Sequence, residues 1–272
     1  MKAITPNIVL ASATDKYMKP KTGYVDPAHR LLGVLKFGPD IKYGTGRKAP
    51  KGHNVGSTKA DLEKKMRKLL GEFAANDKDK KALALFNSFL TPYKVVRIHE
   101  RAKFNKAVSD HKNIKFFCRA AINAPSMSIY NSGKIRIHQK LKAANWDVTK
   151  TAAVHDLGVP ALNIGDKVWG TGDFGNGLGV MVNGIQRAFA IVTHYEYDKS
   201  KAQYLIGLTY IFYDIFGLDD DDLSEYGAMG DNWYSSTAGI GITAWWQLQH
   251  QFGYAPLITR MVVKRQFIIP AK

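Results

Sequence analysis

Two long runs of strand-forming residues follow each other in the second half of the chain. They constrain the fold more than any other feature. The first run covers residues 187–197 and the second covers residues 202–216, with the polar segment Asp198-Lys-Ser-Lys201 between them. Because β-branched and aromatic residues dominate both runs, they predict two antiparallel strands joined by a short turn.

The register of this hairpin decides which side chains share a face. We expect Tyr197 to pair with Ala202 across a four-residue loop, which predicts one apolar face made of Phe189, Ile191, Tyr195, Ile206, Leu208 and Tyr210. The same register places Asp214 one diagonal step from Arg187. It therefore predicts an ion pair between these two residues.

The rest of the chain predicts an α+β fold with a helical basic N-terminal part and an antiparallel β-rich C-terminal part. Lysine, glycine and proline fill residues 1–56, which we expect to be a basic irregular arm. Residues 57–160 form a mainly helical basic region, and residues 161–272 form the β-rich domain with an acidic motif. We expect one helix that begins at Thr58 and a second helix that ends at Thr91-Pro92. Further helices should cover residues 93–108, 135–145 and 239–252, and the last strand should cover residues 257–269.

Charge is distributed unevenly between the two parts. Residues 1–150 carry 31 lysines and arginines against 11 acidic residues, a net charge of +20, whereas residues 151–272 carry a net charge of −4. This asymmetry indicates an anionic partner for the first part. Nucleic acid, an anionic lipid and a bacterial envelope polymer all meet this description, and a solvated lysine-rich surface is the alternative.

The sequence has no motif for a reactive cysteine, a dinucleotide-binding site or a membrane span. Cys118 is the single cysteine and lies in an apolar run, which predicts a buried structural thiol. The pattern at residues 170–175 matches G-x-G-x-x-G, but the sequence after it looks strand-like, so we expect no dinucleotide and no cofactor-binding residues. No run is long and apolar enough for a membrane span.

The acidic segment after the second long run is the best candidate for a chemical site. Four consecutive carboxylates, Asp219 to Asp222, repel one another and therefore favour a bound cation, a basic partner or full solvation. We predict Asp219, Asp220 and Asp222 as ligands of Mg²⁺ or Ca²⁺, and Asp214, Asp219 and Asp222 as catalytic residues. The alternative is an acidic turn that caps a helix beginning near Asp222.

Three spaced motifs resemble a family of unknown function that is frequent in enterobacteria and their relatives. They are Asp214-Ile-Phe-Gly-Leu-Asp-Asp-Asp-Asp222, Trp246-Gln-Leu-Gln249 and Tyr254-Ala-Pro-Leu-Ile-Thr259, and the resemblance covers roughly residues 160–270. Members of that family are often encoded beside type VI secretion genes or resemble bacteriocin cargo. The resemblance therefore implies an antibacterial effector, with a secretion machine and an immunity protein as partners.

A weaker resemblance connects the same segment with toxins of the colicin M type. Those enzymes use Mg²⁺ to cut the lipid-linked peptidoglycan precursor, and they place acidic and aromatic residues after a hairpin as Asp214, Phe216 and Asp219 are placed here. Their motif continues to a His-Arg pair, where this chain has Leu223-Ser-Glu-Tyr226.

The two resemblances imply an antibacterial toxin that acts on the bacterial envelope, and if the chain is an enzyme, the acidic segment favours a metal-dependent hydrolase of the phosphodiesterase type. Because the start of the sequence lacks a signal-peptide apolar region, we expect synthesis in the cytoplasm and secretion into a target cell. A nuclease or nucleic-acid-binding toxin is the alternative, and a non-enzymatic binding module is a third hypothesis.

Overall fold

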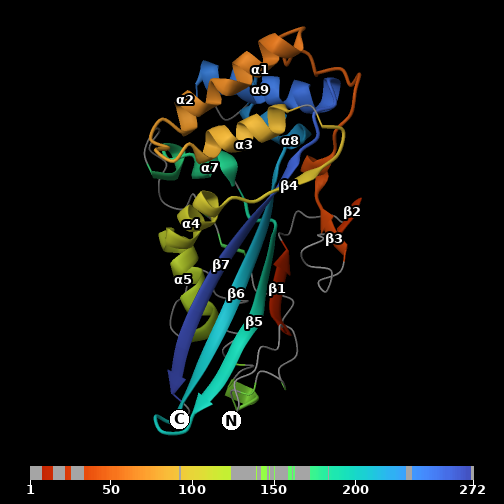
Figure 1. Ribbon diagram of the computed structural model, residues 1–272. Coiled ribbons are helices and arrows are strands. Elements are labelled where there is room, and N and C mark those ends of the chain that lie inside the picture. Colours follow the sequence, from red (N-terminus) through yellow and green to blue (C-terminus); the bar gives the residue numbers. More distant parts are fainter. Residues whose placement is uncertain are drawn as a thin grey trace.

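A five-stranded mixed sheet organises the molecule (Figure 1). The computed structural model describes residues 8–14, 22–25, 34–91, 93–123, 139, 142–145, 147, 150, 159–160, 162, 172–182, 184–230 and 235–270. The strand order is β1-β5-β6-β7-β4. The strands are β1 (Ile8–Thr14), β5 (Arg187–Asp198), β6 (Gln203–Phe216), β7 (Leu257–Pro270) and β4 (Arg97–His99). Among the described strands, only β4 and β7 pair in parallel.

The predicted hairpin is present as β5 and β6, but its register differs from the expected one. Tyr197 pairs with Tyr204 rather than Ala202, because the strands continue to the pair Asp198–Gln203 and the four-residue turn is 199–202 rather than 198–201. The Asp198 carboxylate accepts the backbone N–H groups of Ser200 and Lys201 in this turn. A bulge between Val192 and His194 then reduces the shift from two residues to one.

A shift of one residue changes which side chains share a face. Ala190 now pairs with Tyr210, whereas Phe189 pairs with Ile211 and lies on the opposite face. Arg187 pairs with Tyr213, so the alternation of side chains puts Arg187 and Asp214 on opposite faces of the sheet. The predicted ion pair between them is therefore wrong.

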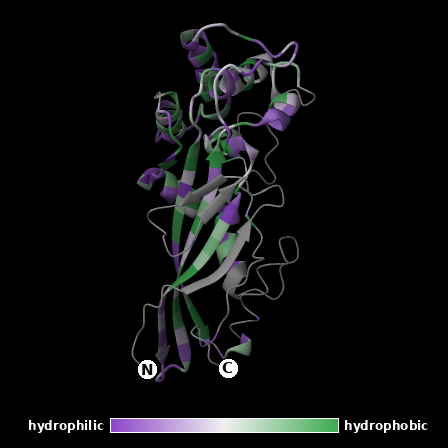
Figure 2. Cartoon of the chain, turned by 90° about the vertical axis from the view of Figure 1, so that its right-hand side faces the viewer, coloured by the Kyte–Doolittle hydropathy of each residue, from purple (hydrophilic) through white to green (hydrophobic). Residues whose placement is uncertain are grey.

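Helices cover one face of the sheet and gather at one end of it (Figure 1). The main core joins this face to residues from α1 (Lys59–Arg67), α2 (Leu69–Phe73), α3 (Lys81–Leu90), α4 (Ala102–Asp110), α5 (Lys112–Asn123), α7 (Leu178–Met181), α8 (Asp220–Tyr226) and α9 (Ser236–Gln251). Figure 2 shows long hydrophobic stretches along the strands that form this core. The confirmed fold class is thus α+β, with a helical N-terminal part and a strand-rich C-terminal part.

A second, smaller core lies on the other face of the sheet. It consists of Ile41, Phe189, Ile191, Ile211, Tyr213, Ile215 and Ile258, with Val96 and Ile98 packed against it. A separate two-stranded sheet is formed by β2 (Thr22–Val25) and β3 (Val34–Phe37). Two one-turn helices, η2 (Pro39–Ile41) and η4 (Gly172–Phe174), complete the described elements, of which no helix could span a membrane.

Several local predictions are confirmed. The hydroxyl of Thr58 accepts the N–H of Asp61 and caps α1, and α3 ends at Leu90, directly before Thr91-Pro92. Helix α9 and strand β7 cover nearly the predicted ranges 239–252 and 257–269. Cys118 is buried, and this burial raises the pKa of its thiol to about 12, as a structural role requires.

Other local predictions are wrong. The expected irregular arm, residues 1–56, contains three strands, because β1 extends the large sheet next to β5 and β2 pairs with β3. The expected helix 93–108 is instead the strand β4 followed by α4, because β7 offers its edge to residues 97–99. Residues 178–181, which looked strand-like, form α7. Most of the expected helix 135–145 lies outside the described residues.

Candidate functional site

The acidic segment caps a helix. Strand β6 ends at Phe216, and α8 begins at Asp220 after Asp219, its N-cap residue. The Asp219 carboxylate accepts the N–H groups of Asp221 and Asp222 at 2.9 and 3.1 Å, and the Asp222 carboxylate accepts the N–H of Asp219 at 3.0 Å. This reciprocal arrangement is a capping box, so the predicted capping role is present, with a helix that begins two residues earlier than expected.

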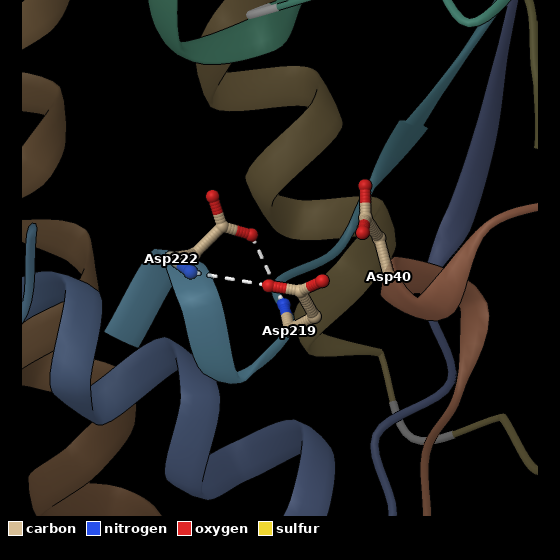
Figure 3. Close-up of side chains that lie close together, drawn as sticks. All are labelled: Asp40, Asp219 and Asp222. Carbon is tan, nitrogen blue, oxygen red and sulfur yellow. Dashed lines mark hydrogen bonds between the residues drawn. The ribbon is translucent and has the colours of Figure 1, made fainter. Parts of the chain in front are cut away.

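A third carboxylate approaches this cap from a distant part of the sequence. Asp40 lies in η2, and one oxygen each of Asp40, Asp219 and Asp222 lies within 4.8 Å of the others (Figure 3). All three side chains are half-buried. We call these three residues the carboxylate cluster. The hairpin strands and α8 therefore bring the acidic segment against a turn that precedes it by about 180 residues.

Gln249 of α9 holds the two halves of the cluster together. Its side chain is fully buried, and its amide nitrogen donates to the carbonyl oxygens of Asp40, Lys42 and Leu218 at 2.6–2.9 Å. Its amide oxygen accepts the N–H of Leu218 at 3.0 Å. One side chain thus connects η2 with the segment that leads into α8, which fixes Asp40 relative to Asp219.

Gly217 allows the close approach of these segments. A Cβ atom at this position would lie 2.4 Å from the carbonyl oxygen of Asp40 and 3.0 Å from the Cβ of Pro256. Any side chain here would push η2 away from the end of β6. In addition, Gln186 donates its amide N–H to the Asp40 carboxylate at 2.6 Å, which orients that carboxylate.

The cluster changes the acidity of one member. Burial raises the pKa of Asp222 to about 7, the hydrogen bond from the Asp219 N–H opposes this rise, and the negative charges of Asp40, Asp219 and Glu225 add to it. Near neutral pH this carboxyl group therefore exchanges its proton readily. A divalent cation would remove the repulsion that contributes to this shift.

The donor set of the cluster fits a hard cation. All three ligand candidates are carboxylates, and Mg²⁺ and Ca²⁺ prefer oxygen ligands. The capping bonds use Oδ1 of Asp219 and Oδ2 of Asp222. In Figure 3 the other oxygen of Asp222 points away from Asp40 and Asp219, so a cation in the cluster would share Oδ2 of Asp222 with the capping bond.

The remaining predicted site residues lie elsewhere. Asp220 forms an ion pair with Arg47 and accepts the indole N–H of Trp246 at 3.2 Å. Asp214 is buried in β6 opposite Thr259, whose hydroxyl donates to the backbone oxygen of Asp214 at 3.1 Å. Neither residue belongs to the carboxylate cluster. Sequence analysis missed Asp40, because the segment Gly38-Pro39-Asp40 indicates only a turn.

Comparisons with known proteins returned no match: no family model, no curated protein and no solved structure resembles this chain significantly.

Proposed function

We propose that the carboxylate cluster binds a divalent cation, Mg²⁺ or Ca²⁺, and that the chain is an antibacterial effector that uses this site on a phosphate-containing envelope substrate. The observation that carries the proposal is the convergence of Asp40, Asp219 and Asp222 within 4.8 Å from two segments far apart in the sequence. A capping box alone accounts for Asp219 and Asp222, but it does not account for a third carboxylate beside them.

In this proposal the residues have separate roles. Asp40 and Asp219 hold the cation, which supplies Lewis-acid chemistry for a phosphoryl group. Asp222 holds the cation in its ionised form, which a bound cation favours over the protonated form. The basic first part, with its net charge of +20, attracts the anionic substrate toward the site.

Regulated expression in a bacterium tests this function. Wild-type protein directed to the periplasm should arrest growth, and the same protein kept in the cytosol should do so less. The double variant Asp219→Asn/Asp222→Asn should be harmless in both compartments while remaining folded. Asp221→Asn is the matched control, because Asp221 is exposed, belongs to the same segment and lies outside the cluster.

A protein that is harmless in both compartments at verified expression levels would refute the effector role. Toxicity that survives the double variant would separate the effector role from the carboxylate cluster. In that case the cluster is a helix cap and the chain acts by another site.

Nucleic acid is the alternative substrate, and the exposed basic residues of the helices favour it. Lys64, Arg67 and Lys68 lie exposed at the end of α1, and Lys112, Lys115 and Arg119 lie exposed along α5. Binding of single-stranded or double-stranded DNA that weakens steeply with salt would support this function, because neutralised phosphates release counterions. Toxicity in the cytosol rather than the periplasm would support it further.

A further inference from the structure

Exposed hydrophobic side chains gather at one place on the described surface. The large exposed hydrophobic residues of the described ranges are Tyr43, Tyr93, Val95, Met229 and Ile268. Three of these five belong to one patch, because the hydroxyl of Tyr43 donates to the carbonyl oxygen of Lys94 at 2.8 Å and so connects residue 43 with residues 93–95. Single exposed hydrophobic residues are common, but a local group of three indicates an interaction surface.

Basic residues adjoin these three residues in the chain. Lys42 and Lys94 are exposed, and the guanidinium of Arg97 lies over the ring of Tyr93, with 3.4 Å between its central carbon and the ring centroid. We call the set Lys42, Tyr43, Tyr93, Lys94, Val95 and Arg97 the lysine–tyrosine patch. It combines amphipathic rings, an aliphatic side chain and positive charge, which is the composition that suits the boundary between lipid headgroups and acyl chains.

The patch is firmly attached to the fold. Arg97 lies in β4 and donates to the carbonyl oxygen of Ser88 at 2.8 Å, and Val96 packs against the second core. In the segment that contains Lys42 and Tyr43, the carbonyl oxygen of Lys42 accepts a hydrogen bond from the side-chain amide of Gln249. Lys42 follows Asp40 by two residues, so at most roughly 7 Å of chain separates the patch from the carboxylate cluster. A surface that docks on this patch would therefore lie close to the cluster.

We propose that the lysine–tyrosine patch docks the protein on a bilayer that contains anionic phospholipids. The side chain of Val95 is 60% exposed and offers an apolar contact, whereas it cannot stack on a nucleic-acid base. One face of the Tyr93 ring is already covered by Arg97, which also disfavours base stacking there. Docking does not need a cation in the carboxylate cluster, so the two proposals can fail independently.

Sedimentation with vesicles in the presence of EDTA tests the docking surface. The wild-type protein should sediment with vesicles of phosphatidylglycerol and phosphatidylcholine, and much less with phosphatidylcholine alone. Lys42→Ala/Lys94→Ala should weaken binding about 10- to 30-fold, since each lysine near an anionic membrane contributes about 1 kcal/mol. Tyr93→Ser/Val95→Ser should also weaken binding.

Matched variants separate the patch from general charge and hydrophobicity. Lys64→Ala/Lys68→Ala removes the same charge from the end of α1 and its C-cap, and Met229→Ser/Ile268→Ser removes two hydrophobic residues outside the patch that are at least as exposed as Tyr93 and Val95. Both control variants should bind the vesicles as the wild type does. Ile268 is a suitable control because it lies roughly 35 Å along β7 from Leu257, the partner of Arg97.

Three results would overturn the proposal. The first is a wild-type protein that does not sediment with anionic vesicles. The second is an equal loss of binding in the patch variants and the control variants. The third is binding of a single-stranded oligonucleotide that is lost in the patch variants while vesicle binding is retained, which would assign the patch to nucleic acid.

Discussion

The long sheet and the carboxylate cluster are held together by different kinds of interaction. Strands β5, β6 and β7 are joined by long backbone ladders, with one bulge between β5 and β6, and by apolar side chains on both faces. At the cluster, by contrast, a buried glutamine side chain joins η2 to the start of α8. The sheet tolerates many apolar sequences, whereas the cluster depends on a few polar side chains, so loss of stability and loss of site geometry should be separable by mutation.

Removing a core side chain from the sheet should cause the largest loss of stability. Phe212 is fully buried in β6, where it packs against Phe117 at a centroid distance of 5.7 Å. Phe212→Ala should lower the free energy of unfolding by about 3–5 kcal/mol, because it leaves a cavity. Urea unfolding measures this loss. If the variant still folds, its affinity for Ca²⁺ should equal that of the wild type; a loss of affinity would mean that the sheet and the cluster are not independent.

Removing the buried glutamine should give a smaller loss of stability but destroy the site. Gln249→Leu removes the donor to the carbonyl oxygens of Asp40 and Lys42 and the acceptor of the Leu218 N–H, and it should cost about 2–3 kcal/mol. Cation affinity should fall with it, because Asp40 is no longer fixed. Thermal unfolding and calorimetric titration measure the two effects.

Gln247→Leu is the matched control for that variant. Gln247 is equally buried on α9, and its amide groups bond Val55, Asn54 and Gly56 rather than Asp40. We expect a similar loss of stability with cation affinity retained. Equal loss of affinity in both variants would show that α9 as a whole, and not Gln249, positions the cluster.

The same contrast explains what the sequence could predict. The strands 187–197, 202–216 and 257–269 were visible because their patterns are local and long, and α1 was visible because Thr58 and Asp61 form a local cap. The register of the hairpin was missed because the strands continue to Asp198 and Gln203 and a bulge near His194 shifts the pairing again, and neither feature has a clear sequence signal. Strand β4 was missed because its three residues depend on β7, which is distant in sequence.

The candidate site was predictable only in part. Asp219 and Asp222 stood out as part of an acidic run, and their neighbour Asp220 could not be distinguished from them. Only the fold turns Asp220 toward Arg47 and Trp246. Asp40 joins the cluster through Gln249, and no spacing in the sequence relates these two residues.

Stability should depend on pH through Asp222. Because the pKa of this group is raised in the folded protein to about 7 from an ordinary value of 3.8, the folded state keeps a proton that the unfolded state has lost between these pH values. The contribution of Asp222 is therefore most favourable at low pH and declines as pH rises to about 7. Relative to Asp222→Asn, the wild type should lose about 2–3 kcal/mol between pH 5 and pH 8 without added cation.

Urea unfolding of both proteins across this pH range measures the difference. A saturating cation should reduce it, because the bound cation stabilises the ionised form of Asp222 at high pH. Parallel pH profiles of the wild type and Asp222→Asn in the absence of cation would contradict the shifted pKa.

Replacing Asp220, which lies outside the carboxylate cluster, should have the smallest effect on stability and on cation affinity. Asp220 pairs with Arg47 at the surface, where the side chains are 52% and 49% exposed, so Asp220→Asn should change stability by less than about 1 kcal/mol. Cation affinity should stay within about two-fold of the wild type, since Asp220 lies outside the cluster. A loss of cation binding in Asp220→Asn would mean that Asp220 is a ligand, as the sequence predicted, and would contradict the cluster of Asp40, Asp219 and Asp222 as the complete set of carboxylate ligands.

Calorimetric titration of Ca²⁺ and Mg²⁺ into the wild type, Asp40→Asn and Asp221→Asn tests the carboxylate cluster most directly. Asparagine at position 40 can still accept the hydrogen bond from Gln186, so this variant removes a charge and keeps the local structure. We predict that the wild type and Asp221→Asn bind one cation with equal affinity and that Asp40→Asn binds at least about ten-fold more weakly. A wild type that binds neither cation, or an equal effect of both substitutions, would contradict the proposed site.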